Sequence, residues 1–349
     1  MTKAVSGAVA LDAMGGDHAP AATVQGAVEA VRQHGLEVLL VGREAALRRH
    51  LSHLGGAPRG LRLVDAPEVV AMDDAPTAPV RAKRNSSMAE ACRLVRDGEA
   101  CAFVTAGNSG AAMVAAKLII GTIAGVERPA LAAPVPGLER QTLVIDVGAN
   151  VDCKPHNLEQ FAIMGEIYYR TIFGTERPSV GLLSIGEEEA KGNDLTRETY
   201  PLLKRLPLNF VGNVEGRDLY NGRIDVIVCD GFVGNVALKI SEGLVEAVRY
   251  LLRDSLTSTI TAQVGALLAR KAFTDFGRKL DYSEYGGAPL LGIKGVAIVG
   301  HGRSNANAIK NAVRVAKQFY ESGVNAHIEK ELTARGDAAP AGVAREENA

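Results

Sequence analysis

The sequence predicts an α/β fold in which a mostly parallel sheet is covered by helices on both faces. Short apolar runs recur along the chain and are continuous, which is typical of strands buried on both faces. Segments of helical length separate these runs almost from end to end, and this alternation indicates a sheet between two helix layers. The predicted strands cover residues 9–12, 37–41, 61–65, 101–105, 143–146, 180–184, 209–212, 226–230 and 296–300. The predicted helices cover residues 22–34, 43–54, 87–97, 158–171, 195–205, 236–252 and 305–320.

The alternation contains no linker and no internal repeat, so we expect a single domain over residues 1–333. Ser87 and Glu90 have the spacing of a capping box, which predicts the start of one helix. Residues 334–349 contain mainly Ala, Gly, Pro and charged residues without periodicity. We therefore expect a disordered tail there.

Composition excludes several classes of protein. The chain has 349 residues, a net charge of -1 and no Trp, which argues against binding to nucleic acid. Its scattered cysteines form no C-x-x-C pair and have no His cluster beside them, so we expect no metal site and a reducing compartment. No apolar stretch is long enough for a signal peptide or a membrane span, which favours the cytoplasm.

Polar, glycine-containing loops follow many of the predicted strands. Glycine lets backbone N–H groups approach a ligand closely, and a following helix N-terminus favours negative charge, so such loops can hold an anion. A single loop of this kind can equally be a tight turn without a ligand. Ligands of α/β sheets bind at the carboxyl ends of strands, and we expect these loops to share one edge of the sheet. The loops cover residues 12–18, 106–111, 146–152, 191–194, 230–235, 285–288 and 301–305.

The known nucleotide and nucleophile motifs are absent. The chain has no G-x-x-x-x-G-K-[ST] and no G-x-G-x-x-G that opens the first helix. Ser109 lies in Gly107-Asn108-Ser109-Gly110, which lacks the spacing of a G-x-S-x-G nucleophile elbow. The remaining Asp, Asn, Lys and His residues suit a reaction in which the bound anion is itself the nucleophile.

The ordered set of motifs resembles the bacterial phosphate acyltransferase family, the acyl-acyl-carrier-protein:phosphate transacylases. The resemblance runs from about Val9 to about Glu331 and departs from the family pattern at Ser109, where the family usually has Thr. Its motifs are DAMGGDHAP (Asp12–Pro20), KRNSSM (Lys83–Met88), GNSGA (Gly107–Ala111), ERPALA (Glu127–Ala132), DVGANVD (Asp146–Asp152), KGND (Lys191–Asp194), DGFVGN (Asp230–Asn235), YGGAPLLG (Tyr285–Gly292) and the segment from His301 to Ala308.

The resemblance implies a three-layer α/β/α sandwich, Rossmann-like and similar to the isocitrate/isopropylmalate dehydrogenase and phosphotransacetylase group. It implies a homodimer that transfers a fatty acyl group from acyl carrier protein to inorganic phosphate, without a dissociable cofactor. The acyl phosphate would then pass to a membrane-bound glycerol-3-phosphate acyltransferase for phospholipid synthesis.

We expect phosphate to attack the thioester carbonyl directly, aided by positioning and by donors to the oxyanion. The predicted phosphate-binding residues are Gly107, Asn108, Ser109, Gly110 and Asn150. The predicted catalytic residues are Lys191 as a countercharge, Asn235 as an amide donor, and Asp146 and Asp230 as bases or orienting groups. Further loop residues expected near substrate are Asp12, Gly15, Gly16, Asp17, His18, Asn193, Gly286, Gly287 and His301.

Each assignment has a plainer alternative. Strand-end aspartates often cap the next helix, and a loop histidine often makes a structural hydrogen bond. Lys191 could be a solvated lysine beside Glu187 and Glu189. Which aspartate acts as the base is left open by the sequence.

Two surfaces are expected to meet partners. Arg81, Lys83 and Arg84 form a basic run that is either a solvated face or a contact for the acidic carrier protein. Residues 256–280 combine apolar residues at helical spacing with basic residues, which is typical of a membrane-surface or partner-binding element, or of a dimer-interface or core helix pair. The resemblance favours an exposed helix pair that contacts the bilayer or guards an acyl groove. We expect Leu267 and Phe273 to contact the membrane, so the protein would be cytoplasmic and peripherally membrane-associated.

Three other functions remain open from the sequence. A phosphotransacetylase acting on a short acyl-coenzyme A would share the fold and the phosphate. A dehydrogenase of the isopropylmalate type would need metal-binding aspartates, for which the spacing is absent. A membrane-associated scaffold would not need the anion-binding loops.

Overall fold

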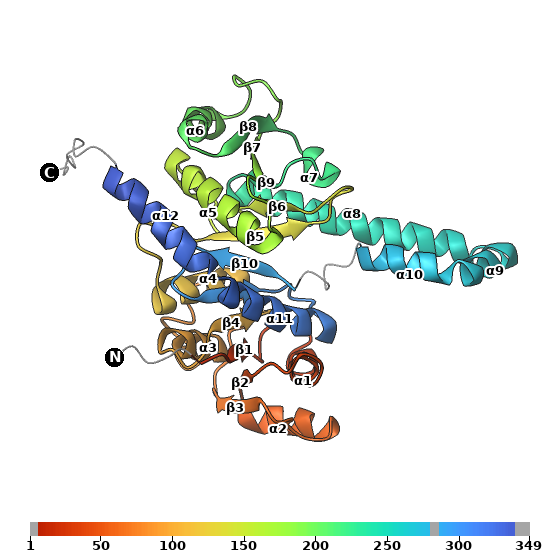
Figure 1. Ribbon diagram of the computed structural model, residues 1–349. Helices are drawn as coiled ribbons and strands as arrows, with labels where there is room; N and C mark the ends of the chain where they lie inside the picture. The colour runs from red at the N-terminus through yellow and green to blue at the C-terminus, as the bar shows by residue number, and fades with distance from the viewer. Residues whose placement is uncertain (1–5, 280–285, 339–349) are drawn as a thin grey trace.

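The computed structural model describes residues 6–279 and 286–338, which form an α/β/α sandwich around one twisted sheet (Figure 1). The 11-stranded sheet of this part of the chain has the order β3-β2-β1-β4-β11-β10-β5-β6-β9-β7-β8. Its strands are β1 (Val9–Asp12), β2 (Val38–Gly42), β3 (Leu61–Asp65), β4 (Ala102–Thr105), β5 (Ala130–Val135), β6 (Thr142–Ile145), β7 (Ser179–Leu183), β8 (Asn209–Val214), β9 (Val226–Val228), β10 (Ala288–Leu291) and β11 (Val296–Val299).

Helices cover both faces of the sheet, as the sequence predicts. One face carries α1 (Ala21–His34), α2 (Glu44–His53), α5 (Pro155–Phe173), α6 (Asp194–Arg205), α11 (Ala306–Ser322) and α12 (Val324–Ala338). The other carries α3 (Ser87–Arg96), α4 (Ser109–Ala115), the π-helix η1 (Ala116–Ile120), α7 (Asp218–Asn221) and the first half of α8 (Gly231–Thr257).

Two hydrophobic cores result from the alternation of side chains along each strand. In β1, Val9 and Leu11 are buried in the core under α1 and α11, whereas Ala10 is buried in the core under α3. This double burial explains why the strands are continuous apolar runs in the sequence.

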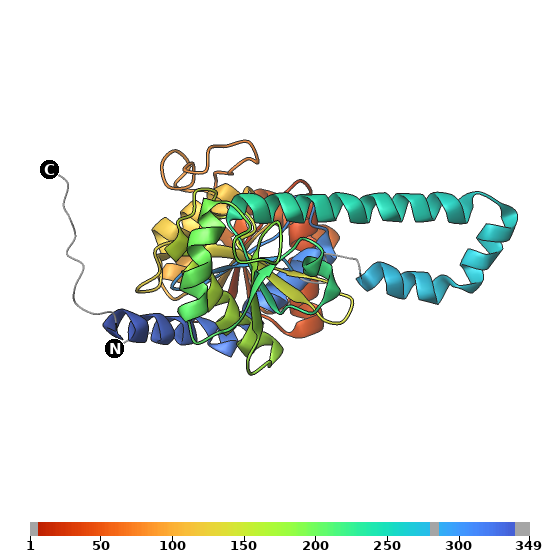
Figure 2. The same ribbon diagram turned by 90° about the horizontal axis from the view of Figure 1, so that it is seen from above.

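The second half of α8 leaves the body of the protein and forms a hairpin with α9 (Ile260–Leu268) and α10 (Arg270–Lys279) (Figure 2). The hairpin corresponds to the segment of residues 256–280 that the sequence singles out, of which Leu280 lies outside the described residues. No helix in the described part of the chain is both long and apolar enough to cross a membrane.

Strand direction reverses at the centre of the sheet, and this contradicts the prediction of one shared loop edge. The pairs β11–β10, β10–β5 and β5–β6 are antiparallel, while all other neighbouring pairs are parallel. Three successive reversals make β6 antiparallel to β11. Consequently β1, β4 and β11 end at one edge, here called the Asp12 edge, and β6, β9 and β7 end at the opposite one, the Asp146 edge.

Other differences from the predictions are local. The prediction missed β5 and β10, two antiparallel strands that contain Pro134 and Pro289 and few β-branched residues. The capping prediction was wrong by one residue, because Ser86 is the N-cap of α3 and its hydroxyl accepts from the N–H of Ala89. The tail prediction was wrong up to Ala338, where α12 ends, and residues 339–349 lie outside the described residues.

Candidate functional site

At the Asp12 edge, the loops after β1 and β4 are locked together by buried polar groups. The Thr105 hydroxyl donates to the Asp12 carboxylate at 2.8 Å, and the Gly107 N–H donates to Thr105 Oγ1 at 3.0 Å. A Cβ at Gly15 would lie 2.6 Å from Asp12 Oδ2 and 2.8 Å from the Gly107 nitrogen, so only glycine fits there. Burial raises the pKa of Asp12, although hydrogen bonds from Ser87 and Thr105 oppose that shift. Asp12 and Gly107 are therefore occupied in joining the loops.

The side chain of Asn108 also makes its hydrogen bonds within the protein. Its Oδ1 accepts from the N–H of Ala111 as the N-cap of α4, and its amide nitrogen donates to the carbonyl oxygens of Met72 and Asp74, both at 3.0 Å. Ser109 is exposed at the first position of α4, and Gly110 lies beside Pro76. Asn108 thus fastens the long segment between β3 and α3 to the β4 loop.

The remaining loop residues of the Asp12 edge lie around the loop after β11. The N–H of Asp17 donates to the Gly302 carbonyl at 2.7 Å, next to Gly16. His18 is exposed. Gly286 and Gly287 both have positive φ and enter β10 beside α11 and β11, where a Cβ would meet backbone atoms.

At the Asp146 edge, a fully buried carboxylate organises the loop after β6. Asp146 Oδ1 accepts from the N–H groups of Leu131, Gly148 and Ala149, and Oδ2 accepts from the N–H and the side-chain amide of Asn150. Burial raises the pKa of Asp146 to about 6, and these hydrogen bonds oppose the shift. The Asp146 carboxylate therefore holds the backbone of this loop in place through its hydrogen bonds.

The loop after β9 packs directly on the Asp146 loop. The Gly231 N–H donates to the Asn150 carbonyl at 2.8 Å, and a Cβ at Gly234 would overlap the Asp146 carbonyl oxygen. Asn150 uses its amide nitrogen for Asp146 and for the Pro129 carbonyl, whereas the side chain of Asn235 is exposed and lies against Gly148. The structure therefore brings the predicted residues Asp146, Asn150 and Asn235 together.

Asp230 begins α8 as its N-cap. Its Oδ1 accepts from the N–H groups of Phe232 and Val233 at 2.9 and 3.0 Å. The plainer alternative for a strand-end aspartate is thus realised at this position. The cap uses only one carboxylate oxygen.

Lys191 lies in the loop after β7, the strand next to β9, and its side chain is exposed. Its glutamate neighbours pair with other cations, because Glu187 lies 2.8 Å from Arg217 and Glu189 lies 3.3 Å from Lys204. No described residue forms an ion pair with Lys191. Asn193, two residues on, is the N-cap of α6.

Several polar groups near the two edges were missed from the sequence. Arg128 donates to the Asp152 carbonyl at 2.6 Å, and Glu127 pairs with His156, which lowers the pKa of Glu127. Arg128 and Glu127 belong to the ERPALA motif, so the sequence contained a signal that could have indicated them. Arg128 adds a positive charge beside the Asn150 loop.

Helix α8 connects the two edges through its polar residues. It begins at the Asp146 edge, and farther along it Lys239 Nζ lies 3.3 Å from His301 Nε2. Glu242 lies 3.4 Å from the same nitrogen, and Glu246 lies 2.9 Å from Arg303. Burial raises the pKa of Glu242, but hydrogen bonds from His301 and Lys239 outweigh it, so its pKa is lowered. His301 therefore contacts α8 rather than standing alone in its loop.

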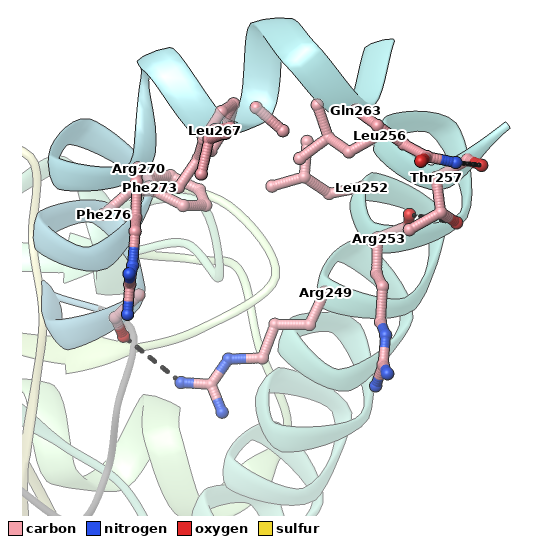
Figure 3. A pocket seen from close by; sticks show the side chains of 12 residues that line it. Arg249, Leu252, Arg253, Leu256, Thr257, Gln263, Leu267, Arg270, Phe273 and Phe276 are labelled. Carbon is pink, nitrogen blue, oxygen red and sulfur yellow. Dashed lines mark hydrogen bonds between the residues drawn. The ribbon is translucent and has the colours of Figure 1, made fainter. Parts of the chain in front are cut away.

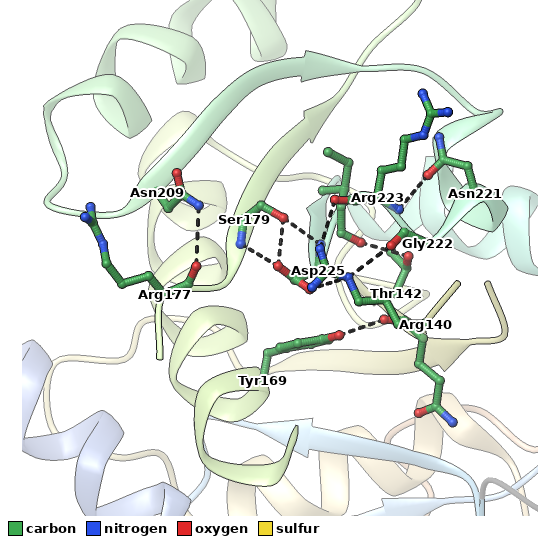
Figure 4. Close-up of polar contacts among 12 residues, drawn as sticks. Arg140, Thr142, Tyr169, Arg177, Ser179, Asn209, Asn221, Gly222, Arg223 and Asp225 are labelled. Atoms are coloured by element: carbon green, nitrogen blue, oxygen red, sulfur yellow. Dashed lines mark hydrogen bonds and ion pairs between the residues drawn. The ribbon is translucent and has the colours of Figure 1, made fainter. Parts of the chain in front are cut away.

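A polar network holds the amino ends of β6, β7 and β9 together (Figure 4). Buried Asp225 accepts from the N–H and the hydroxyl of Ser179, both at 2.8 Å, and its other oxygen lies 3.2 Å from Arg140 Nε. The Tyr169 hydroxyl donates to the Gln141 carbonyl nearby. This network fixes the strands that carry the Asp146 edge.

No group of three His, Cys, Asp or Glu residues suited to a metal is found among the described residues.

The basic run after β3 is divided in the structure. Lys83 forms an ion pair with Asp74, which lowers the pKa of that carboxyl. Arg81 and Arg84 are exposed. Of the run, Lys83 is thus engaged in an ion pair, whereas Arg81 and Arg84 have no ion pair with the described residues, and Arg84 Nε donates to the Val80 carbonyl at 3.2 Å.

Two solved structures with a similar fold are named as a phosphotransacetylase and a phosphotransacylase. The fold is similar to a phosphotransacetylase from Streptococcus pyogenes, with a TM-score of 0.61 and 16% identity over 92% of this chain and 95% of that one. It is also similar to a branched-chain phosphotransacylase from Enterococcus faecalis, with a TM-score of 0.54, 14% identity, and 90% and 98% of the two chains covered. The Rossmann-like α/β fold of this class is thereby confirmed.

Sequence comparison defines the family. The family model described as fatty acid synthesis protein matches residues 8–327. A phosphate acyltransferase of Acidobacterium capsulatum is 56% identical over 94% of this chain and 98% of its own length, and one of Koribacter versatilis is 59% identical over 94% of each. The protein is an acyltransferase, and the chain belongs to the fatty acid synthesis protein family, whose relatives are named phosphate acyltransferase.

We predict that Asp146 makes stability depend on pH between about 4 and about 6. Its pKa is raised from 3.8 to about 6 by burial, so in this range the folded chain binds more protons than the unfolded chain. The free energy of unfolding should fall as pH rises through this window, by up to about 3 kcal/mol. Urea unfolding of the wild type and of Asp146→Asn across pH 4–7 measures the effect. Asp146→Asn should lack this slope, and an equal slope in both proteins would contradict the assignment.

Proposed function

We propose that this acyltransferase moves a long-chain fatty acyl group from acyl carrier protein to inorganic phosphate, giving an acyl phosphate for phospholipid synthesis. The names of the relatives and of the family support acyl transfer to phosphate. The observation that carries the proposal is the Asp146 edge, where exposed Lys191 has no ion pair with the described residues and lies in the loop after β7, the strand next to β9, whose own loop carries Asp230 and Asn235. A cation and an amide can bind the phosphate dianion, and a carboxylate can accept its proton during the reaction.

In the proposed mechanism, phosphate binds at the Asp146 edge between Lys191 and Asn235. A phosphate oxygen attacks the thioester carbonyl carbon, the C–S bond breaks, and the carrier thiolate leaves and is protonated. Asp230 keeps Oδ2 outside its helix cap, so it is suited to accept a proton from phosphate. Positioning of phosphate next to the thioester supplies most of the rate acceleration, because the bound anion is itself the nucleophile. No dissociable cofactor takes part.

The Asp12 edge serves the rest of the substrate in this proposal. Its Gly107 N–H and Asn108 amide are already engaged, which leaves the exposed Ser109 hydroxyl and the nearby Arg81 and Arg84 for contacts. The arginines are suited to the acidic surface of a carrier protein. A phosphotransacetylase of short acyl-coenzyme A is the second function that the fold allows, and consumption of acyl-coenzyme A in place of the carrier thioester would favour it.

We also propose a homodimer that associates with the cytoplasmic membrane surface and delivers acyl phosphate to a membrane-bound glycerol-3-phosphate acyltransferase. Apolar residues spaced by four are exposed along α8, namely Phe232, Val236, Ile240 and Leu244. A row of this kind suits contact with a second copy. The outer side of the hairpin exposes Ile260 and Leu268, which suits a lipid surface.

Lys191→Ala is predicted to lower acyl phosphate formation at least about 100-fold, because the countercharge to phosphate is lost. The assay uses palmitoyl-acyl carrier protein, phosphate and hydroxylamine, and follows acyl hydroxamate. Lys204→Ala is the matched control, since Lys204 is paired with Glu189 near the same loop. Full activity of Lys191→Ala, or hydroxamate formed without phosphate, would contradict the mechanism.

Leu244→Asp is predicted to convert a dimer into a monomer, because a charge in the α8 row cannot be buried unpaired. Size exclusion with light scattering measures the mass. Leu118→Asp, at an exposed apolar position of η1, should leave the dimer intact. A wild-type monomer, or a dimer unaffected by Leu244→Asp, argues against this interface.

The double variant Ile260→Asp, Leu268→Asp is predicted to lose most binding to vesicles that contain anionic lipid. Co-sedimentation with and without 1 M salt, at which charge attraction is screened, separates the apolar from the ionic part. Leu118→Asp again serves as the control. If the double variant sediments with vesicles like the wild type, the hairpin tip does not make the membrane contact.

A further inference from the structure

Leu267 and Phe273, which the sequence assigns to membrane contact, line the groove between the arms of the α8–α9–α10 hairpin, here called the hairpin groove (Figure 3). They lie across from Leu252 and Leu256 of α8. None of the predicted phosphate-binding or catalytic residues lines this groove. The geometry of the proposed phosphate site therefore depends on another part of the molecule, the loop that carries Lys191.

The Lys191 loop is held by a buried asparagine of the neighbouring strand. Asn213, near the end of β8, is 6% exposed, and its amide nitrogen donates to the Glu188 carbonyl at 2.8 Å. The N–H of Lys191 donates to the same carbonyl at 3.0 Å and closes a turn over residues 188–191. Because a carbonyl oxygen can accept two hydrogen bonds, this one acceptor joins the Asn213 side chain to the backbone of Lys191.

Two further contacts restrict Lys191 within the loop. The Ser184 hydroxyl donates to the Lys191 carbonyl at 3.4 Å. A Cβ at Gly186 would lie 3.1 Å from Cγ of Lys191, so the aliphatic stem of the lysine lies against the backbone of Gly186. The turn is thus attached to β8 at Glu188, and a displacement of the turn would displace the ammonium group of Lys191.

The surroundings of Asn213 indicate that its amide does not serve stability. No described donor reaches its buried Oδ1, and an unpaired buried oxygen lowers the free energy of unfolding. Leu182, its register partner in β7, and Val214, the next residue, are buried and apolar. An apolar side chain of similar size would remove the unpaired oxygen and leave the Glu188 carbonyl with the Lys191 donor. The contribution specific to Asn213 is its hydrogen bond to the turn.

We propose that Asn213 is a positioning residue for Lys191 and thereby sets the affinity of the site for phosphate. In this role Asn213 contacts neither substrate and acts through the turn of residues 188–191. The proposal rests on the proposed function, because it requires Lys191 to bind the phosphate that attacks the thioester. Without the hydrogen bond the turn can shift, and a misplacement of about 1 Å can lower a rate about 100-fold.

The test is the hydroxamate assay at varied phosphate concentration, with palmitoyl-acyl carrier protein as the acyl donor. Asn213→Leu should raise the KM for phosphate at least about tenfold and leave the KM for the carrier thioester unchanged. Its melting temperature without phosphate should equal or exceed that of the wild type, because the unpaired oxygen is lost. Asn213→Ala removes the same donor with a smaller side chain and should change the two KM values in the same way.

Asn209→Leu is the matched control. Asn209 begins the same strand, and its amide nitrogen donates to the Arg177 carbonyl at 3.4 Å, at the amino ends of β7 and β8 and thus away from the Lys191 loop. This variant should have the phosphate KM of the wild type. A double-mutant cycle adds Asn213→Leu to Lys191→Ala, where no ammonium group remains to be positioned, and no further fall in kcat/KM for phosphate is expected.

A purely structural role of Asn213 would give different results. It would lower the melting temperature of both Asn213 variants while the KM for phosphate stays that of the wild type, and failure of both variants to fold would have the same meaning. An equal fall in kcat/KM with and without Lys191 would show that Asn213 does not act through the lysine. Each of these outcomes overturns the proposal.

The activity of Lys191→Ala separates failure of this proposal from failure of the proposed function. Full activity of Lys191→Ala, or no hydroxamate from the wild type, removes the proposed function. Low activity of Lys191→Ala together with a normal phosphate KM in Asn213→Leu removes only the positioning role of Asn213.

Discussion

The reversal of strand direction at the centre of the sheet is the constraint on which the rest of the structure depends. The antiparallel pairs that β5 and β10 make place the loops of each half at opposite edges. Each edge then has its own buried carboxylate, Asp12 in one half and Asp146 in the other, which holds its loops together by hydrogen bonds. Glycines such as Gly15 and Gly234 are needed where these loops meet, because a side chain would collide with the carboxylate or with the backbone.

Helix α8 is the element that joins the two edges and the hairpin. Its N-cap Asp230 lies at the Asp146 edge, its middle contacts His301 through Lys239 and Glu242, and its last turns form one wall of the hairpin groove. A single helix therefore passes from the proposed phosphate site to the proposed membrane surface. Because one helix connects these sites, no further domain is needed to link the proposed reaction site to the proposed membrane contact.

The sequence could predict the layers of the fold because buried parallel strands and amphipathic helices have distinct periodicities. It could not predict strand direction, since β5 and β10 contain Pro134 and Pro289 and resemble loops. For the same reason the predicted phosphate site was divided: Gly107 and Asn108 lie at one edge, and Asn150, Lys191 and Asn235 at the other. The KGND motif made Lys191 a candidate, but the sequence could not indicate that Asn108 and Asp146 use their polar groups within the protein.

Thermal unfolding in the presence of phosphate shows at which edge the anion binds, because a ligand that binds only the folded state raises the melting temperature. The comparison is between the wild type, Lys191→Ala at the Asp146 edge and Ser109→Ala at the Asp12 edge. Phosphate should raise the melting temperature of the wild type and of Ser109→Ala, and leave that of Lys191→Ala unchanged. Stabilisation that survives in Lys191→Ala and disappears in Ser109→Ala would place the anion at the Asp12 edge and rule out phosphate binding by Lys191.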